Sequence, residues 1–444
     1  MKKRNKADSD HTQTLQRLVF FVLIIFTAGL YSCSVNKQLS KTADAILLKD
    51  SAVNTGHIGI CIYEPATNKY WYNHNETHYF IPASNTKLFT LYAGMKYLGD
   101  SLVGLRYQIK GDSMIIDAAG DPTFLLSEFK DQSVLKFLEH QKNIYLSDNF
   151  LFKDMLGNGW AWNDFKDSYM AQRSSFPIYG NVVKAKWIAT DSVNIYPSFY
   201  QNKIGVLEKL QTGFEVIKGF EDNHFAFING AAKDKEVPFR PDLVSIQSLL
   251  EDTLKIKTGI DWSNYNKPGN LKIHSQPTDS LFKPMMHRSD NFFAEQTLLM
   301  ASNEHLGYMS DEKIIDTILS NDLKDVPQRP KWVDGSGLSR YNLFTPQSFV
   351  YILNKMKNEF GLERMKVILP TGGEGTLSSY YKKDAGFIYA KTGTLSNNCA
   401  ISGYLITNKG KLLIFSILSN NYITGATPIR KAAERFLQGI REKY

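Results

Sequence analysis

Residues 82–99 read PASNTKLFTLYAGMKYLG, and their apolar side chains recur at the spacing of one helix face. These apolar residues are Leu88, Leu91, Tyr92 and Met95. Gly99 suits the end of such a helix. Ser84 and Lys87 stand three positions apart at its start, which places their side chains on the same side of the first turn. We therefore expect a core helix that carries this serine and lysine.

This pair suggests acyl-transfer chemistry. A serine hydroxyl is a poor nucleophile unless a neighbouring group takes its proton, and a lysine can do so once burial or a second cation lowers its pKa. The N–H groups and the dipole at the helix N-terminus also favour negative charge beside Ser84. However, the pattern Ser-x-x-Lys occurs seven times in the chain, and two solvated side chains are the alternative for any single match. Further partners are needed.

The N-terminal segment predicts export. Basic residues precede an apolar run from Leu18 to Leu30, which is short for a membrane span and suits the core of a signal peptide. The run ends at Leu30-Tyr31-Ser32-Cys33, which resembles a bacterial lipoprotein signal. This resemblance implies that a signal peptide, residues 1–32, is removed and that Cys33 carries a lipid. Ordinary secretion with a coincidental cysteine is the alternative.

Composition excludes several classes of protein. With 444 residues and 43% hydrophobic content, the chain can bury a large core and form two or more domains. Its net charge of +8 is not gathered in basic runs with interleaved aromatic residues, so we expect no nucleic-acid partner. No HExxH or HxH pair occurs, so we expect neither a metal site nor a cofactor. Cys61 and Cys399 lie in strand-like sequence, and we expect free buried thiols rather than a disulfide.

The order of patterns predicts an α+β fold. Residues 57–72 alternate like two strands, and short strands, turns and brief helices follow from about 101 to 275. Helical patterns return after Asp290 and after Thr345-Pro346. The C-terminal part then predicts strands at 386–393, 399–407 and 411–418 and a helix from Pro428. These strands can complete the sheet that begins near Gly56.

Two further motifs supply partners for the serine and lysine. Ser289-Asp290-Asn291 stands just before a helix, and Lys391-Thr392-Gly393-Thr394 lies on the first of the final strands. With these elements the sequence resembles the penicillin-recognising serine enzymes. A rival set, Ser147-Asp148-Asn149 and Lys257-Thr258-Gly259, has the spacing of a compact β-lactamase. We reject it because the stretch after Lys257 is expected to be loop, whereas a hairpin and a closing helix follow Lys391.

The distance between Ser84 and Ser289 leaves room for an inserted module. Together with the stretches at 120–123, 334–340 and 369–377, it makes the chain resemble the DD-carboxypeptidase/DD-endopeptidase type of penicillin-binding protein, peptidase S13-like. This resemblance implies a β-lactamase/transpeptidase-like domain, with an antiparallel sheet flanked by helices and a helical lobe. We assign this domain to residues 33–100 and 276–444, and an inserted β-rich module to residues 101–275.

The resemblance also implies roles in acylation. Ser84 would attack the carbonyl of a D-Ala-D-Ala bond or of a D-configured cross-link, and Lys87 as the free amine would accept its proton. A nearby Lys391 ammonium would lower the pKa of Lys87. The backbone N–H groups of Ser84 and Thr394 would bind the oxyanion. A β-lactam would acylate Ser84 in the same way, and the resulting ester would be hydrolysed slowly.

Other residues would bind the substrate. Ser289 would pass a proton to the leaving amine, and Asn291 would donate to the substrate amide. The terminal carboxylate would be held by Lys391, Thr392 and Thr394, with Gly393 leaving room for a close backbone approach.

The resemblance also implies a site that recognises diaminopimelate in the substrate. In the family, a Trp-rich segment with an Asp and a Tyr faces an Arg and holds the free amino-acid end of this residue. The matching positions here are Asp164, Tyr169 and Arg340, with the Trp-rich segment at 160–164. A structural ion pair among core tryptophans is the alternative. For Asp334 and the glycines near 335–337 and 372–375, turn geometry is the better explanation.

We therefore predict a DD-peptidase that acts on peptidoglycan stem peptides and is acylated by β-lactams. It would be a membrane lipoprotein of the cell envelope that faces the periplasm. A serine β-lactamase is one alternative, although no glutamate is placed to argue for it. A non-catalytic wall-binding or antibiotic-sensing lipoprotein is another, although every expected catalytic residue is present.

Overall fold

The computed structural model describes residues 38–444 apart from 190–191, 208–214, 229–233 and 265–268. The expected signal peptide, residues 1–32, and Cys33 lie outside the described residues. Among the helices of the described part, none has the length and apolar character needed to cross a membrane.

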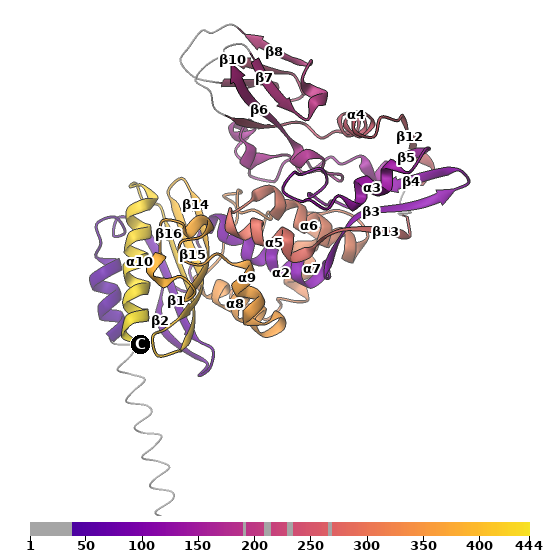
Figure 1. The fold of residues 1–444 in the computed structure, drawn as a ribbon. Helices are drawn as coiled ribbons and strands as arrows, with labels where there is room; N and C mark the ends of the chain where they lie inside the picture. The colour runs from indigo at the N-terminus through magenta and orange to yellow at the C-terminus, as the bar shows by residue number, and fades with distance from the viewer. Residues whose placement is uncertain (1–37, 190–191, 208–214, 229–233, 265–268) are drawn as a thin grey trace, which may run out of the picture.

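One antiparallel sheet joins the two ends of the described chain, as Figure 1 shows. Its strand order is β14-β15-β16-β1-β2. The strands are β1 (His57–Glu64), β2 (Lys69–His74), β14 (Ile388–Leu395), β15 (Asn398–Ile406) and β16 (Leu412–Asn420). Strands β1 and β16 pair from His57 opposite Asn420 to Tyr63 opposite Ile414. The predicted union of the N-terminal hairpin with the C-terminal strands is confirmed.

Helices cover both faces of this sheet. On one face lies α10 (Ala426–Lys443), whose Phe436 and Ile440 pack against the sheet (Figure 1). The other face packs against the helical lobe, whose core includes Tyr404 and Leu418 of the sheet. The lobe consists of α2 (Lys87–Tyr97), α5 (Thr278–His287), α6 (Asn291–Leu306), α7 (Asp311–Ser320), α8 (Pro346–Phe360) and α9 (Leu362–Ile368).

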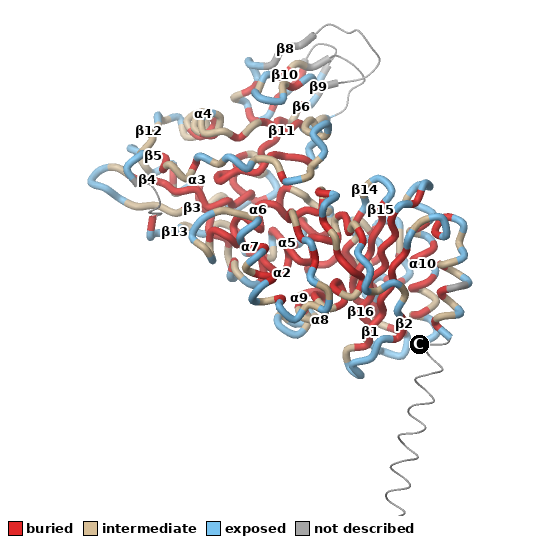
Figure 2. Tube along the Cα trace, turned by 180° about the vertical axis from the view of Figure 1, so that it is seen from behind, coloured by how far each residue is buried: buried red, intermediate tan, exposed pale blue. Residues whose placement is uncertain are grey.

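Helix α2 is buried over most of its length. Every residue from Lys87 to Met95 is buried, and Figure 2 shows α2 inside the lobe. The ring of Phe89 contacts the rings of Trp332, Phe344 and Phe349 at centroid distances of 4.8–5.7 Å. Gly99 follows the helix with a φ of 69°, which a glycine adopts at little cost. The predicted core helix is therefore confirmed.

The chain leaves the lobe after Asp100 and returns at Thr278, whose N–H donates to the Asp100 carbonyl at 2.9 Å. Between these points it forms a five-stranded sheet with the order β12-β5-β4-β3-β13 and two three-stranded sheets, β11-β6-β7 and β8-β10-β9 (Figure 1). The strands of the five-stranded sheet are β3 (Ser101–Lys110), β4 (Ser113–Asp117), β5 (Ile144–Ser147), β12 (Thr258–Asp261) and β13 (Leu271–Pro277). The other strands and α-helices of this stretch are α3 (Ser133–Glu139), α4 (Leu243–Leu254), β6 (Val182–Ala189), β7 (Ser192–Tyr196), β8 (Ile204–Leu207), β9 (Glu215–Lys218), β10 (Phe225–Ile228) and β11 (Lys235–Pro238).

The stretch after Lys257 differs from the expected loop. It contains β12 and β13, and β13 pairs with β3 at the border of the lobe. The rival motifs lie in this five-stranded sheet, where Ser147 pairs with Asp261 rather than with the strands beside Ser84. The prediction of a loop was wrong because β13 carries mostly polar side chains, LKIHSQP, that conceal its strand character.

Candidate active site

Ser84 lies in a tight turn that leads into α2. The turn is the 3-10 helix η2 (Ala83–Thr86), and Lys87 is the first residue of α2. Serine and lysine are thus one turn apart, although the sequence predicted a single α-helix. Ala83 has a φ of 48°, a strained conformation for a residue with a side chain. The neighbouring backbone must therefore hold this turn in place.

Two glycines allow neighbouring backbone to lie directly against the Ser84 turn. A Cβ atom on Gly393 would lie 2.6 Å from the Pro82 oxygen and 2.9 Å from the Ser84 nitrogen. A Cβ atom on Gly337 would lie 1.9 Å from the Ala83 oxygen, and Gly337 has a φ of 81°. No side chain fits at either position. Strand β14 and the loop at 334–340 therefore clamp the Ser84 turn from two directions.

The Lys87 amine faces Ser84. Its Nζ lies 3.0 Å from Ser84 Oγ, and it donates to Asn291 Oδ1 and to the Ser336 carbonyl at 2.6 Å each. These last two atoms can only accept hydrogen bonds. When Lys87 is neutral, its two N–H groups are taken by them, and its lone pair is left for the Ser84 hydroxyl.

Burial makes the neutral form of Lys87 accessible. The side chain is completely buried, and burial lowers its pKa to about 8. The carboxylates of Asp334, Glu295 and Asp290 oppose this shift by favouring the ammonium. Burial, rather than the Lys391 charge expected from the sequence, is the main cause of the low pKa.

Lys391 and Ser289 form a second pair. Lys391 Nζ donates to Ser289 Oγ at 2.8 Å and to the Thr392 carbonyl at 2.5 Å. Burial, and then the positive charges of Lys87 and Arg430, hold the Lys391 pKa well below its usual value. Because two buried ammonium groups repel each other, the two lysines favour one positive charge over two.

Asn291 links these groups to the module between β3 and β13. Besides accepting from Lys87, it donates through Nδ2 to the Tyr169 carbonyl at 2.9 Å. Asp290 caps α6 by accepting from the Phe293 N–H at 2.9 Å, which fixes Asn291 as the first helical residue. One of the two Asn291 amide hydrogens is thus already used, whereas the sequence suggested only a contact with substrate.

The threonines of β14 lie beside the lysines. Thr392 Oγ1 donates to Thr376 Oγ1 at 2.7 Å, and Thr394 is exposed and accepts from Arg430. The structure therefore brings Ser84, Lys87, Ser289, Asn291, Lys391 and the 392–394 segment into one site.

The residues expected at diaminopimelate lie at the edge of this site. Burial and the charges of Asp167 and Asp164 raise the pKa of the Tyr169 phenol, so Tyr169 and Asp164 are neighbours. Arg340 is exposed and donates to the Ser396 carbonyl at 3.1 Å. No ion pair joins Asp164 to Arg340 in the described part of the chain, and Trp162 is 74% exposed. The alternative of a structural ion pair among core tryptophans is therefore wrong.

A buried charge network behind Lys87 was not expected from the sequence. Asp334 is fully buried and accepts hydrogen bonds from the N–H groups of Gly337 and Ser339, so the prediction that it stabilises a turn is confirmed. It also accepts from Trp160 Nε1 at 3.0 Å. Glu295 accepts from the Ser336 N–H at 2.7 Å and lies 3.5 Å from Arg173 Nη1. Burial and the Asp334 charge raise the pKa of Glu295 to about 7.

Arg430 is a second residue that sequence reasoning missed. It lies on α10 and donates through Nη2 to Thr394 Oγ1. The helix was predicted, but nothing in its pattern indicates which of its residues reaches β14.

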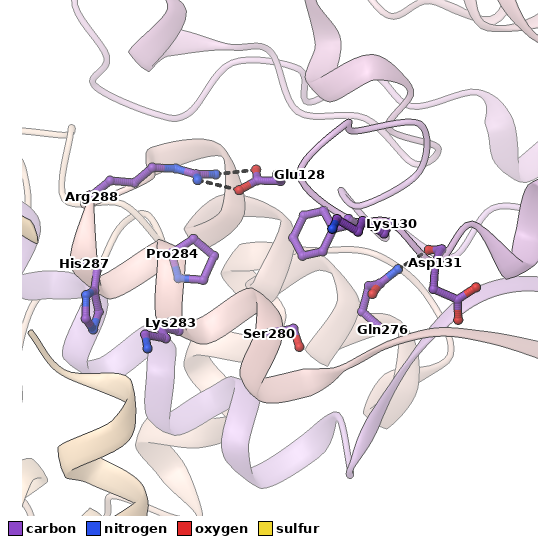
Figure 3. A pocket seen from close by; sticks show the side chains of 10 residues that line it. Glu128, Lys130, Asp131, Gln276, Ser280, Lys283, Pro284, His287 and Arg288 are labelled. Atoms are coloured by element: carbon purple, nitrogen blue, oxygen red, sulfur yellow. Dashed lines mark hydrogen bonds and ion pairs between the residues drawn. The ribbon is translucent and has the colours of Figure 1, made fainter.

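A hollow in the surface is lined by Arg288, the residue before Ser289. A cavity of about 650 Å³ lies between α5 and residues 128–131, as Figure 3 shows. At one end of this cavity, Arg288 forms a bidentate ion pair with Glu128, with distances of 2.6 and 2.7 Å. Cys61 and Cys399 are buried free thiols, and Cys399 lies opposite Thr394 in the pairing of β14 with β15. Within the described residues, no cluster of three or more His, Cys, Asp or Glu side chains could hold a metal ion.

Comparisons with known proteins find relatives of similar sequence and similar fold. The chain is 23% identical to the D-alanyl-D-alanine carboxypeptidase of Actinomadura sp. (strain R39) over 88% of its own length and 82% of the relative. The crystal structure of penicillin binding protein 4 from Haemophilus influenzae matches with a TM-score of 0.72 and 20% identity. That match covers 91% of this chain and 99% of the other. The structure of the same Haemophilus protein with a β-lactam gives a TM-score of 0.66, 19% identity and the same coverage.

These findings confirm the predicted α+β, penicillin-recognising fold. The fold and the site define a serine hydrolase of the penicillin-recognising class. The sequence profile of the D-Ala-D-Ala carboxypeptidase 3 (S13) family matches residues 39–213 and 245–439, so the chain belongs to this family.

Proposed function

We propose that the protein is a D-Ala-D-Ala carboxypeptidase or DD-endopeptidase that cleaves peptidoglycan stem peptides through an acyl-enzyme on Ser84. The observation that carries this proposal is the position of Lys87 Nζ, 3.0 Å from Ser84 Oγ, with its other two contacts made to acceptors. A buried amine with a pKa of about 8 can take a hydroxyl proton near neutral pH.

Acylation follows from these contacts. Ser84 Oγ attacks the carbonyl carbon of the penultimate D-alanine while its proton moves to Lys87 Nζ. The oxyanion forms beside the N–H groups of Ser84 and Thr394. As the C–N bond breaks, the Ser289 hydroxyl gives its proton to the leaving amine and takes one from Lys391 at 2.8 Å. The products are an ester on Ser84 and either free D-alanine or, from a cross-link, a peptide whose new amine is on a D-configured carbon.

Hydrolysis restores the enzyme. The two lysines together carry one positive charge, which passes back to Lys391 before the second step. Water attacks the ester carbon and gives a proton to the neutral Lys87. The ester C–O bond breaks, Ser84 Oγ regains the proton, and the shortened peptide leaves. We propose that a β-lactam forms the same ester and leaves slowly, in keeping with the β-lactam bound to the Haemophilus relative.

We also propose that Asp164, Tyr169 and Arg340 recognise the free end of diaminopimelate. Tyr169 lies beside Asp164 and is tied by its carbonyl to Asn291, so this segment adjoins the site. An acidic and a basic side chain suit the ammonium and carboxylate of a zwitterion. Asp164→Ala should raise KM for a diaminopimelate peptide and leave KM unchanged for an acetyl-lysine peptide.

For location we propose an exported lipoprotein of the cell envelope, anchored through a lipid on Cys33 and facing the periplasm. The support is the apolar run and Leu30-Tyr31-Ser32-Cys33. Incorporation of labelled palmitate by the full-length protein, and its loss in Cys33→Ser, would test this anchor. Equal labelling of the variant would contradict it.

Release of D-alanine from a peptide ending in D-Ala-D-Ala tests the activity. We expect Ser84→Ala to lose roughly a thousandfold or more in rate. Ser127→Ala is the matched control, because this exposed serine begins another Ser-x-x-Lys sequence. Retained activity in Ser84→Ala would contradict the mechanism. Rapid hydrolysis of a cephalosporin without D-alanine release would indicate a β-lactamase, and inactivity toward both would indicate a binding protein.

A further inference from the structure

Ser289 is the middle one of the three residues that link α5 to α6. Its φ of 63° lies in the left-handed region, which a residue with a side chain keeps only when its surroundings hold it there. The Arg288 N–H donates to the Pro284 carbonyl at 3.1 Å and closes the last turn of α5, and Asp290 caps α6. The direction of the Ser289 hydroxyl therefore depends on the residues on either side of it.

The Arg288 side chain bridges this link. Its Nε donates to Asp290 Oδ2 at 3.0 Å, while Asp290 Oδ1 accepts from the Phe293 N–H. The guanidinium also lies 4.9 Å from the centre of the Phe293 ring. One arginine thus joins the residues before and after Ser289 and rests on the first turn of α6.

Glu128 holds the other side of the guanidinium. Nη1 and Nη2 of Arg288 donate to its two carboxylate oxygens at 2.6 and 2.7 Å, as Figure 3 shows. Glu128 lies between β4 and α3, in the stretch that leaves the lobe after Asp100. Two parallel hydrogen bonds fix the plane of a guanidinium. Glu128 therefore determines where Arg288 holds Asp290.

This ion pair is better suited to orientation than to stability. The side chains of Arg288 and Glu128 are 46% and 37% exposed, and ion pairs in such contact with water contribute little to stability. A catalytic group that moves by about 1 Å can nevertheless lose about 100-fold in rate. Substitutions in the pair should therefore leave the protein folded and change its chemistry.

We infer that Arg288 and Glu128 are positioning residues that orient the Ser289 hydroxyl toward the leaving nitrogen of the scissile bond. This inference rests on the proposed DD-peptidase function and adds two residues to it. Ser289 gives its proton to that nitrogen and takes one from Lys391 Nζ, 2.8 Å away. An amine does not leave as its anion, so cleavage of the C–N bond needs this proton, whereas a thiolate leaves without it.

Two substrates that differ only in the leaving atom test this assignment. They are an acyl-D-Ala-D-Ala peptide and the thioester in which sulfur replaces the leaving N–H. Arg288→Gln should lower kcat/KM about 10- to 100-fold for the peptide and less than about 3-fold for the thioester. Glu128→Gln should give a smaller loss in the same direction. Arg288→Lys should keep part of the peptide activity, because an ammonium lacks the planar fork of the guanidinium.

Asp279→Asn is the matched control. Asp279 lies at the opposite end of α5 and accepts from Arg364 at 2.7 and 3.0 Å. This substitution also removes a bidentate ion pair from α5, but not the one beside Ser289. It should leave the ratio of the two kcat/KM values unchanged.

Two results would overturn the inference. One is an equal loss for peptide and thioester in Arg288→Gln, which would make the ion pair only a structural link. The other is an unchanged ratio in a variant that folds. If wild type cleaves neither substrate, the proposed function fails separately. The inference is then tested with benzylpenicillin, whose ring nitrogen needs the same proton, and with a boronic acid, which joins Ser84 without a leaving group. Arg288→Gln should slow acylation by the penicillin and leave the affinity for the boronic acid unchanged.

Discussion

At the scale of single residues, the proposed chemistry depends on the charge balance around Lys87. Burial favours the free amine, whereas Asp334, Glu295 and Asp290 favour the ammonium. Glu295 is the member that titrates near neutral pH, because burial and Asp334 raise its pKa to about 7. Arg173 opposes that shift from 3.5 Å. Besides burial, the pKa of Lys87 therefore depends on carboxylates that do not contact Ser84.

We predict that Glu295→Gln moves the pH dependence of Ser84 acylation toward lower pH. Acylation requires neutral Lys87, so its rate should rise with pH through a midpoint near the Lys87 pKa of about 8. The Glu295 carboxylate raises that pKa, and its removal lowers it, so the rising limb shifts downward. Stopped-flow rates of penicillin acylation between pH 5 and pH 10 would measure this.

Glu304→Gln is the control for this measurement. Glu304 lies on the same helix α6 and pairs with Arg106 and Lys272, away from Lys87. Its removal should leave the midpoint unchanged. A midpoint that stays in place or rises in Glu295→Gln would contradict the charge balance described above.

At the scale of elements, the site depends on how closely β14 packs against η2. Strand β14 lies at the edge of the sheet and is held in register by β15, with Gly393 opposite Ala400. Gly393 then meets the backbone of Pro82 and Ser84 without an intervening side chain. The position of the nucleophile relative to Lys391 therefore follows from one contact between a strand and a turn.

We predict that Gly393→Ala lowers acylation by about 100-fold, since its Cβ would displace the Ser84 turn from β14. Gly439→Ala on α10 is the matched control, because its Cβ would meet no atom within 4 Å. That variant should acylate normally and gain up to about 1 kcal/mol in stability. Normal acylation by Gly393→Ala would show that the close contact is unnecessary.

The sequence was most informative where local patterns and the site coincide. The apolar spacing around Leu88 and the cap at Thr345 both predicted helices that the structure contains. The final two strands are recognisable because they are rich in apolar residues. The predicted helices and strands place Lys87 at the start of α2, Asn291 at the start of α6 and Lys391 in β14, as the structure has them.

Contacts between distant elements could not be predicted in the same way. The Glu295–Arg173 pair joins α6 to the module between β3 and β13, and the Arg430–Thr394 contact joins α10 to β14. No local pattern records such partners, because charged residues on helices usually face solvent. The 3-10 turn at Ser84 was also missed, since its strain at Ala83 is imposed by Gly337 and Gly393 rather than by its own sequence.

At the scale of the whole molecule, the module between β3 and β13 takes part in the site. Tyr169 binds Asn291, Trp160 binds Asp334, and Arg173 reaches Glu295 and Asp311. We propose that residues 101–275 form this inserted module and that residues 33–100 with 276–444 form the catalytic domain. The hydrogen bond between Asp100 and Thr278 lies next to these borders, although β13 extends past residue 275 to Pro277.

We predict that Arg173→Met lowers the free energy of unfolding by about 3–5 kcal/mol, because it leaves the buried Glu295 without its cation. Denaturant unfolding followed by tryptophan fluorescence would measure the loss. Lys136→Met is the control, since the Lys136–Asp131 pair is largely exposed and should contribute at most about 1 kcal/mol. Equal effects of the two substitutions would contradict a structural part for the buried network.

The central claim is that Ser84 is the nucleophile that becomes acylated in this protein. The most direct test is the intact mass of the protein from residue 34 onward, before and after benzylpenicillin, for wild type, Ser84→Ala and Ser127→Ala. We predict one stable adduct on wild type and on Ser127→Ala, and none on Ser84→Ala. An equal adduct on Ser84→Ala, or no adduct on wild type, would contradict the assignment of Ser84.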